Sequence, residues 1–134
     1  MSRKLSMVEQ GYARFNAHDL DWVLGHLARD VIWEDAADVP DTRVYRGVEE
    51  VRSFLESFER HWETLRFEPL ELLEGPGVVM ARCRLVGRGR ASGAEVDAEV
   101  IHLFTVRRRK VRAIRTFFDR ETAAEAAGIQ LSAG

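Results

Sequence analysis

The spacing of the hydrophobic residues changes at Leu65, and this change constrains the fold more than any other feature of the sequence. Before Leu65, apolar residues recur every three or four positions, which is the period of an amphipathic helix. After Leu65 they alternate with polar residues, which is the period of a half-buried strand. Turn-forming residues at 75–77, 92–93 and 107–110 divide this second part into four predicted strands joined by hairpins. Helices followed by such a sheet predict an α+β fold.

The first part of the chain is predicted to hold three helices and a short strand. Asp19 is a suitable N-cap for the second helix. The strand is rich in β-branched and aromatic residues, and its alternation places Val31, Trp33 and Asp35 on one face. The predicted elements are a helix over 5–15, a helix from 20 that ends at 29–30, the strand 31–35, a loop over 36–42, an extended piece at 44–45 and a helix over 48–62.

The predicted strands after Leu65 differ in how their two faces are used. The second strand, 79–90, alternates apolar residues with arginines, so we expect one buried and one solvated face. The last strand, 112–119, carries large apolar groups on both faces. This predicts that its outer face is covered as well, by a second subunit. An Ala-rich helix over 121–127 follows and ends at Gly128.

Length, charge and cysteine content exclude several classes of protein. A chain of 134 residues is long enough for one domain, 1–134, with one core and room for one cavity. Its net charge of -2 argues against nucleic acid or an anionic membrane as the main partner. Cys83 is the only cysteine, so neither an internal disulfide nor a cysteine-rich zinc site is expected. The first residues lack the apolar stretch of a signal peptide, and the expected location is the cytoplasm.

Three short segments resemble a known superfamily. They are NAHDLD at 16–21, DVIWED at 30–35 and FFDR at 117–120. With the order of the elements, they resemble the nuclear-transport-factor-like superfamily, and most closely its SnoaL-like branch, which includes polyketide cyclases, ketosteroid isomerase and limonene epoxide hydrolase. The resemblance implies a cone-shaped α+β barrel, in which a curved antiparallel sheet wraps round three N-terminal helices, with a short C-terminal helix. It also implies an apolar pocket and a homodimer packed through the sheets.

Positions that match ketosteroid isomerase carry implied roles. The isomerase's general base is an aspartate in a Glu-Asp pair after the second helix, and Asp35 stands at that position. Its oxyanion hole uses an aspartic acid and a tyrosine. The aspartic acid position falls on His102, which can also donate a hydrogen bond. The tyrosine position falls on Gly11, one residue before Tyr12.

Other active-site chemistries find no matching residues. The Asp-Arg-Asp set of limonene epoxide hydrolase falls on Leu85, Cys83 and Thr116, which cannot activate a water as carboxylates do, so that mechanism is not expected. Cys83 has no histidine beside it in its strand, which argues against a nucleophile. No His or carboxylate set has metal-ligand spacing. The sequence therefore predicts no metal and no cofactor.

Asp35 and His102 are the candidate catalytic residues. An Asp35 carboxylate that faces an apolar interior has a raised pKa and suits proton abstraction next to a carbonyl. The alternative is a solvated acid at the start of a polar loop. His102 lies between Val100 and Phe104 on the inner face of its strand, where it can donate to a substrate oxygen. The alternative is a core histidine that a backbone carbonyl or the Thr116 hydroxyl satisfies.

The remaining candidates form the wall of a pocket for a hydrophobic molecule, although aromatic residues at these spacings are also typical of plain core. The predicted substrate-binding residues are Tyr12, Trp33, Phe54, Phe58, Cys83, Leu85, Val100, Phe104, Thr116 and Phe118. The leading hypothesis is a cofactor-independent isomerase or cyclase that acts by proton transfer on a hydrophobic carbonyl compound. The rival hypothesis is a non-catalytic module that binds a small molecule or serves dimerisation. A third hypothesis, binding of a polyanion through the basic hairpin at 107–110, predicts salt-sensitive association.

Overall fold

The computed structural model describes residues 2–37 and 43–131 of the chain. The elements follow in the order α1 (Arg3–Asn16), α2 (Leu20–Gly25), β1 (Leu27–Glu34), β2 (Val44–Arg46), α3 (Val48–His61), β3 (Trp62–Gly75), β4 (Val78–Gly89), β5 (Glu95–Arg107), β6 (Lys110–Phe117) and α4 (Arg120–Ala127). Helices precede a hairpin-linked sheet, so the predicted α+β class and the three predicted hairpins are confirmed. Most of the predicted loop, 38–42, lies outside the described residues.

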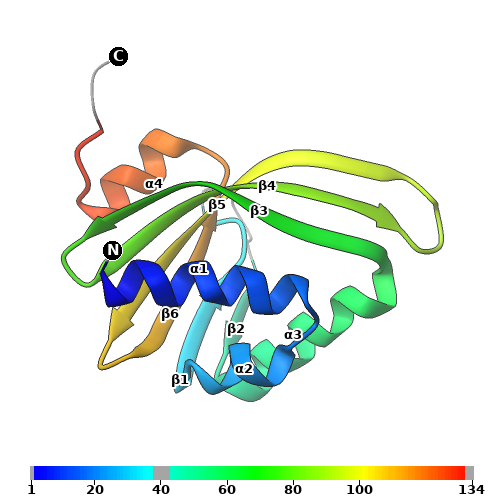
Figure 1. The fold of residues 1–134 in the computed structure, drawn as a ribbon, viewed down its shortest axis with the longest axis horizontal. Helices are drawn as coiled ribbons and strands as arrows, with labels where there is room; N and C mark the ends of the chain where they lie inside the picture. The colour runs from blue at the N-terminus through cyan, green and yellow to red at the C-terminus, as the bar shows by residue number, and fades with distance from the viewer. Residues whose placement is uncertain (1, 38–42, 132–134) are drawn as a thin grey trace.

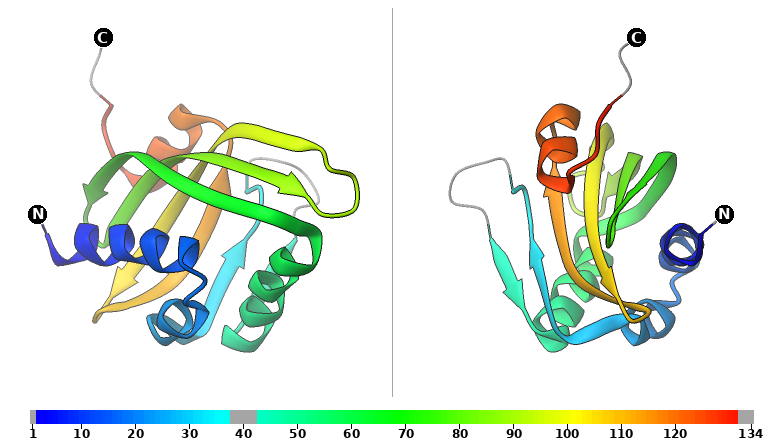
Figure 2. Two further views of the ribbon diagram at one scale, coloured as in Figure 1. Left: turned by 45° about the vertical axis from the view of Figure 1, so that its right-hand side comes forward. Right: turned by 90° about the vertical axis from the view of Figure 1, so that its left-hand side faces the viewer.

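The sheet is six-stranded, with the order β2-β1-β6-β5-β4-β3. It curves round α1, α2 and α3 and does not close, as Figures 1 and 2 show. Four of the five neighbouring strand pairs are antiparallel, but β1 and β6 pair in parallel. The expected antiparallel sheet is confirmed for the hairpin-linked strands, and the sequence did not predict the parallel pair of β1 and β6. Hairpin signals fix only strands that are consecutive in the chain, and β1 and β6 are separated by most of the sequence.

Two boundaries differ from the predicted ones. The second helix ends at Gly25, and β1 begins at Leu27 rather than at residue 31. Leu27 and Val31 are buried in the strand, and the same two residues also fit a helical stripe, so spacing alone could not separate the alternatives. Trp62 begins β3 instead of ending α3. The Asp19 cap is confirmed, because its carboxylate accepts a hydrogen bond from the Trp22 amide at 3.2 Å.

The inner face of the sheet packs against the N-terminal helices in two apolar clusters. One cluster joins α2 and α3 to β1 and β6 through residues such as Leu24, Val51 and Ile114. The other joins α1 to β4 and β5, and its buried members are Val8, Tyr12, Val79, Ala81, Cys83 and Val100. These clusters hold α1 across the open side of the sheet (Figure 1).

The outer face of the sheet is covered in part by the chain's own C-terminal helix. Figure 2 shows α1 and α4 on opposite sides of the sheet. The small residues Ala123, Ala124 and Ala127 of α4 let it approach closely, and they bury Met80, Ile101, Leu103 and Phe117. The apolar outer side of the last strand that indicated a second subunit is therefore explained within the chain, because Phe117 is covered by α4. The homodimer remains a prediction that now rests on the family resemblance.

Beyond α4, the outer face carries a charged ladder of three arginines from β4 and the acids beside them. Arg82 pairs with Glu99 at 2.7 Å and lies 3.6 Å from Glu71. The other rungs are Arg84 with Asp97 at 2.6 Å and Arg88 with Glu95 at 2.9 Å. The predicted solvated face of this strand is thus confirmed, with its charges largely neutralised by cross-strand pairs.

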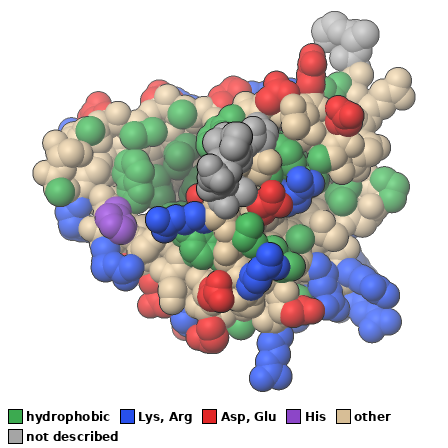
Figure 3. All heavy atoms as spheres, turned by 180° about the vertical axis from the view of Figure 1, so that it is seen from behind, with side chains coloured by type: hydrophobic (Ala, Val, Ile, Leu, Met, Phe, Trp, Pro, Cys, Tyr) green, Lys and Arg blue, Asp and Glu red, His purple; other side chains and the backbone are tan. Residues whose placement is uncertain are grey.

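Some apolar side chains are left exposed, among them Ile32, Val44, Leu70 and Phe118. Figure 3 shows hydrophobic side chains gathered on one part of the back of the molecule, beside charged groups. Within the described ranges, no helix has both the length and the apolar character needed to cross a membrane.

Gly87 is required by the close approach of β3, which generates a first prediction. A Cβ at this position would lie 2.7 Å from the Thr64 carbonyl oxygen and 3.0 Å from Leu65 Cδ1. Gly87→Ala must therefore displace the backbone of β3, and we expect it to lower the free energy of unfolding by about 1–3 kcal/mol. Urea denaturation measures this.

The matched control is Gly25→Ala at the end of α2, where nothing lies within 4 Å of the added Cβ. This control is expected to be neutral or slightly stabilising, because alanine suits a helix better than glycine. Equal effects of the two substitutions would contradict the packing argument.

Candidate functional site

A small apolar cavity of about 80 Å³ lies between the N-terminal helices and the inner face of the sheet. Its wall consists of Met7, Val8, Gly11, Tyr12, Phe15, Trp22, Val23, His26, Leu27, Trp33, Leu55, Phe58, Phe67, His102, Phe104, Val111 and Ile114. Among these described residues there is no Asp, Glu, Lys or Arg. The chemistry of the cavity therefore depends on a few neutral polar groups in apolar surroundings.

The central polar feature is a hydrogen bond between Tyr12 of α1 and His102 of β5. The Tyr12 hydroxyl lies 2.7 Å from His102 Nδ1, and the two side chains belong to residues only 6% and 5% exposed. Three phenyl or indole rings surround the imidazole, those of Trp33, Phe67 and Phe104, with centroids 5.4 to 5.9 Å away. The pair is thus held by rigid elements and shielded from water.

Burial keeps both members of the pair neutral. Desolvation lowers the pKa of His102 to about 4 and raises the pKa of Tyr12 well above its usual range. Two arrangements of the proton are then open. If Tyr12 donates to Nδ1, the imidazole carries its proton on Nε2, and if Nδ1 donates to the hydroxyl, the tyrosine proton is directed at its other partner, the Cys83 side chain. The first arrangement leaves the Nε2 proton of His102, which lines the cavity, for a further acceptor.

Cys83 lies behind this pair on the neighbouring strand β4. Its side chain is fully buried and hydrogen-bonds with Tyr12, and burial raises the pKa of the thiol to about 11. A thiol with that pKa is protonated at neutral pH and is a poor nucleophile. Cys83 therefore belongs to the support of Tyr12 rather than to the cavity wall.

Trp33 and Thr116 form a second buried polar contact. The Trp33 indole nitrogen donates to the Thr116 hydroxyl at 3.2 Å, and Thr116 lies opposite His102 in the sheet. This bond fixes the Trp33 ring, which lies edge-on to the imidazole at 5.9 Å between centroids. Thr116 is thus another support residue, outside the cavity lining.

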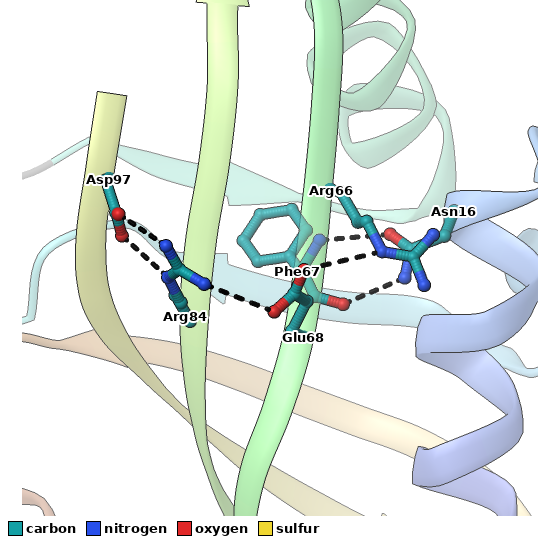
Figure 4. Close-up of polar contacts among 6 residues, drawn as sticks. All are labelled: Asn16, Arg66, Phe67, Glu68, Arg84 and Asp97. Carbon is teal, nitrogen blue, oxygen red and sulfur yellow. Dashed lines mark hydrogen bonds and ion pairs between the residues drawn. The ribbon is translucent and has the colours of Figure 1, made fainter. Parts of the chain in front are cut away.

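Asn16, the last residue of α1, binds this helix to the edge strand β3. The sequence analysis assigned no role to Asn16. Its side-chain amide donates to the Phe67 carbonyl at 2.8 Å, and its side-chain oxygen accepts from the Phe67 amide at 3.0 Å (Figure 4). The two bonds copy the pairing of a neighbouring strand and fix Phe67, whose ring lines the cavity. Figure 4 also shows the ion pairs of Glu68 with Arg66 and Arg84 on the other side of β3. An asparagine directly after the predicted helix 5–15 was the only available signal.

Asp35 lies just beyond β1 and is not among the described residues that line the cavity. Its carboxyl is half-buried, and this burial raises its pKa, while the positive charge of Arg43 acts in the opposite direction. The structure gives no hydrogen bond or ion pair between Asp35 and His102 in the described part of the chain. Asp35 comes two residues after Trp33, which does line the cavity, so it lies near the wall without belonging to it.

The other predicted wall residues divide into two groups. Tyr12, Trp33, Phe58 and Phe104 line the cavity, and so does the catalytic candidate His102. Outside the lining lie Phe54, Cys83, Leu85, Val100, Thr116 and Phe118. Phe54 stacks on Tyr45 behind the wall, and Leu85 and Val100 pack in the core under α1. Phe118 is 60% exposed, because β6 ends at Phe117 and the strand alternation stops there.

Size limits what the cavity accepts. An engineered apolar cavity of about 150 Å³ is known to bind benzene. The present cavity, at about 80 Å³, is smaller, so a flat polycyclic compound does not fit inside it as it stands. It accepts a small apolar group. In the described ranges no cluster of His, Cys, Asp or Glu is arranged to hold a metal ion.

The chain belongs to the SnoaL-like domain family, whose pattern matches residues 8–122. That match includes every residue of the cavity wall except Met7, and both members of the Tyr12–His102 pair. No curated protein matches the sequence.

Similar solved structures confirm the nuclear-transport-factor-like fold. An NTF2-like protein of unknown function from Burkholderia pseudomallei is 21% identical, with 95% of this chain and 98% of that chain covered and a TM-score of 0.79. A putative polyketide cyclase from Pseudomonas putida is 18% identical, with coverage of 95% and 99% and a TM-score of 0.78. TerC, crystallised with polyporic acid, is 19% identical, with coverage of 95% and 99% and a TM-score of 0.76. At these identities the likeness shows the fold.

The buried imidazole predicts a specific pH dependence of stability. In the unfolded chain His102 has its usual pKa of 6.5, whereas in the folded protein the pKa is about 4. As the pH falls from 6.5 toward 4, the unfolded state binds a proton that the folded state does not, so folding becomes less favourable. The loss attributable to His102 is up to about 3 kcal/mol.

Urea denaturation of the wild type and of His102→Gln across this pH range measures the effect. As the pH falls, the free energy of unfolding of the wild type is expected to decrease toward that of the variant. A difference between the two proteins that stays constant with pH would contradict the neutral, buried imidazole.

The Asn16 contact generates a separate prediction. Asn16→Ala removes both bonds to the Phe67 backbone, leaves a part-buried amide and carbonyl without that partner, and should cost about 1–3 kcal/mol of unfolding free energy. Gln10→Ala is the control, because Gln10 lies on the exposed side of the same helix and bonds to Ser6. The control is expected within about 0.5 kcal/mol of the wild type. Equal losses of unfolding free energy in the two variants would show that the Asn16 bonds do not anchor β3.

Proposed function

We propose that this protein is a cofactor-independent enzyme of the isomerase or cyclase type, which transfers a proton on a small hydrophobic carbonyl compound. The observation that carries the proposal is the neutral Tyr12–His102 pair, which offers one hydrogen-bond donor inside a cavity without charged lining residues. A carbonyl oxygen needs such a donor when it becomes an enolate. A neutral imidazole serves as the donor, because an imidazole with a pKa of about 4 is not protonated at neutral pH.

Asp35 is the proposed base. Its carboxylate removes a proton from the carbon next to the carbonyl, which leaves a carboxylic acid and an enolate, and the same proton is then returned to the substrate carbon skeleton. The raised pKa of Asp35 suits it to both halves of this exchange. Two residues of extended chain span about 7 Å. A ligand that touches Trp33 and extends outward along β1 therefore brings its reacting carbon toward Asp35.

Other members of the fold support this choice of substrate class. One similar structure is named a putative polyketide cyclase, and another was crystallised with polyporic acid. Polyketides and polyporic acid are oxygen-bearing organic molecules. They agree with a site built from apolar walls and neutral donors.

The second candidate function is non-catalytic binding of a small molecule in the same cavity. The observation that favours it is the position of Asp35 outside the cavity lining. Both functions predict that a small ketone binds and contacts the Tyr12–His102 pair. They differ in whether protons of the bound ketone exchange.

Proton exchange in D₂O separates the two functions without knowledge of the natural substrate. A panel of acetone, butanone and 2-pentanone is incubated with the protein, and loss of the α-proton signal is followed by NMR. We expect the wild type to accelerate exchange, and Asp35→Asn to lower the rate about a hundredfold or more while ketone binding survives. The rate in the wild type should fall at low pH, because a protonated Asp35 cannot accept a proton.

Asp30→Asn is the matched control, since Asp30 is an exposed aspartate of β1, the strand that Asp35 follows, and it pairs with Arg112. It should leave exchange unchanged. Full exchange activity in Asp35→Asn would contradict the role of Asp35. Binding of ketones by the wild type without any exchange would establish the non-catalytic function instead.

A further inference from the structure

A basic groove opens beside the apolar cavity. It is a hollow of about 790 Å³, lined by Ser2, Arg3, Lys4, Ser6, Met7, Gln10, Trp22, Gly25, His26, Val106, Arg108, Arg109 and Lys110. Five of these described residues are Lys or Arg, and none is Asp or Glu. Such a one-sided charge is unexpected in a chain whose net charge is -2, and it creates a local positive potential.

The cavity and the groove share part of their walls. Met7, Trp22 and His26 line both. The Trp22 and His26 rings are stacked with centroids 3.8 Å apart, and His26 Nδ1 donates to the Trp22 carbonyl at 2.8 Å. These contacts fix the two rings at the boundary, so an apolar interior and a cationic surface meet at one rigid junction.

Three of the five cations of the groove have no acid beside them. The other two have partners: Lys4 lies 3.7 Å from Glu74, and Lys110 donates to the Gly25 carbonyl. Within the described ranges, none of the ion pairs of the structure includes Arg3, Arg108 or Arg109. By contrast, the arginines of the charged ladder are matched with acids. The groove therefore retains positive charge from Arg3, Arg108 and Arg109, whereas the charged ladder does not.

The backbone of the β5–β6 hairpin is strained where it supplies two of these cations. Arg108 and Arg109 have φ of 54° and 63°, as the two central residues of a type I′ turn require. Asn-Gly is the favoured pair there, because side chains such as arginine are disfavoured at positive φ. Arginine at both positions costs stability, and such strain is typical of a position kept for function.

We propose that the ligand of this protein is an amphipathic anion, whose small apolar group occupies the cavity and whose carboxylate or phosphate binds the cations of the basic groove. This inference rests on the proposed function and adds the class of substrate, a carbonyl compound that also carries an acidic group. The size of the cavity supports a ligand that binds in both places. A volume of about 80 Å³ accepts only a short apolar segment and leaves the rest of the ligand outside. Arg108 and Arg109 determine specificity, because they select the acidic group.

Short-chain ligands test this division of the site. Hexanoate, hexyl phosphate and 1-hexanol share one apolar chain and differ in the head group, and their binding is measured by calorimetry. We expect both anions to bind at least about tenfold more tightly than hexanol, a difference in binding free energy of about 1.4 kcal/mol. The comparison of hexanoate with hexyl phosphate identifies the preferred head group. Equal affinities for the anions and the alcohol would overturn the proposal while leaving the apolar cavity and the proposed function standing.

Two variants separate the groove from the cavity. Arg108→Asn combined with Arg109→Gly relieves the strained turn, so this protein should unfold at higher temperature and yet bind hexanoate about tenfold more weakly, with hexanol unaffected. The charge-matched control is Arg52→Gln with Arg60→Gln, on α3 and outside both linings, which should leave hexanoate binding unchanged. Unchanged hexanoate binding in the turn variant would overturn the proposal.

Gly11→Leu tests the apolar part. Gly11 lines the cavity within α1, and the nearest atom to an added Cβ is a Trp22 ring carbon at 4.0 Å, so leucine fills the space and favours the helix. We expect this variant to lose hexanoate binding. If hexanoate binding survives, or if a single-stranded oligonucleotide competes with hexanoate in the wild type, the groove binds anions independently of the cavity and the proposal fails.

Discussion

The hydrogen bond between Tyr12 and His102 is the interaction on which the rest of the site depends. It places two polar side chains in surroundings that offer them few other partners, so each keeps the other satisfied and in a fixed orientation. Breaking it would leave a buried hydroxyl and a buried imidazole without each other, at a cost of about 1–3 kcal/mol for each group. The same burial that makes the bond necessary lowers the pKa of His102 and keeps the imidazole neutral, and the proposed role of the pair as a neutral donor depends on this.

The fold serves to hold this pair in place from both sides. Tyr12 comes from α1 and His102 from β5, and these elements meet because α1 lies across the inner face of the sheet. Asn16 ties the end of α1 to Phe67 of the edge strand, and Thr116 fixes Trp33 next to the imidazole. On the outer face, α4 covers the apolar residues behind β5. The site is therefore built on packed elements rather than on loops, and this limits how far a ligand can displace its walls.

Much of this architecture was predictable, because it depends on local periodicity. The alternation of β5 correctly placed His102 and Phe104 at the cavity, and the hairpin signals fixed the order of the last strands. Contacts between distant segments were not predictable. The helical register of Tyr12 toward His102, the parallel pairing of β1 with β6 and the cover that α4 gives to the outer face all depend on tertiary packing. Phe118 was misplaced because alternation carries no information about where a strand ends.

The protonation of His102 is the most direct test of the account. In protein labelled with ¹⁵N at histidine, the ring nitrogen shifts report both the charge and the tautomer across a pH titration. The account predicts that His102 stays neutral until the pH approaches 4, with one ring nitrogen protonated, and that a bound ketone shifts its resonances. An imidazole that titrates near its ordinary pKa of 6.5 and ignores the ketone would contradict the central claim that this pair is a buried, neutral donor.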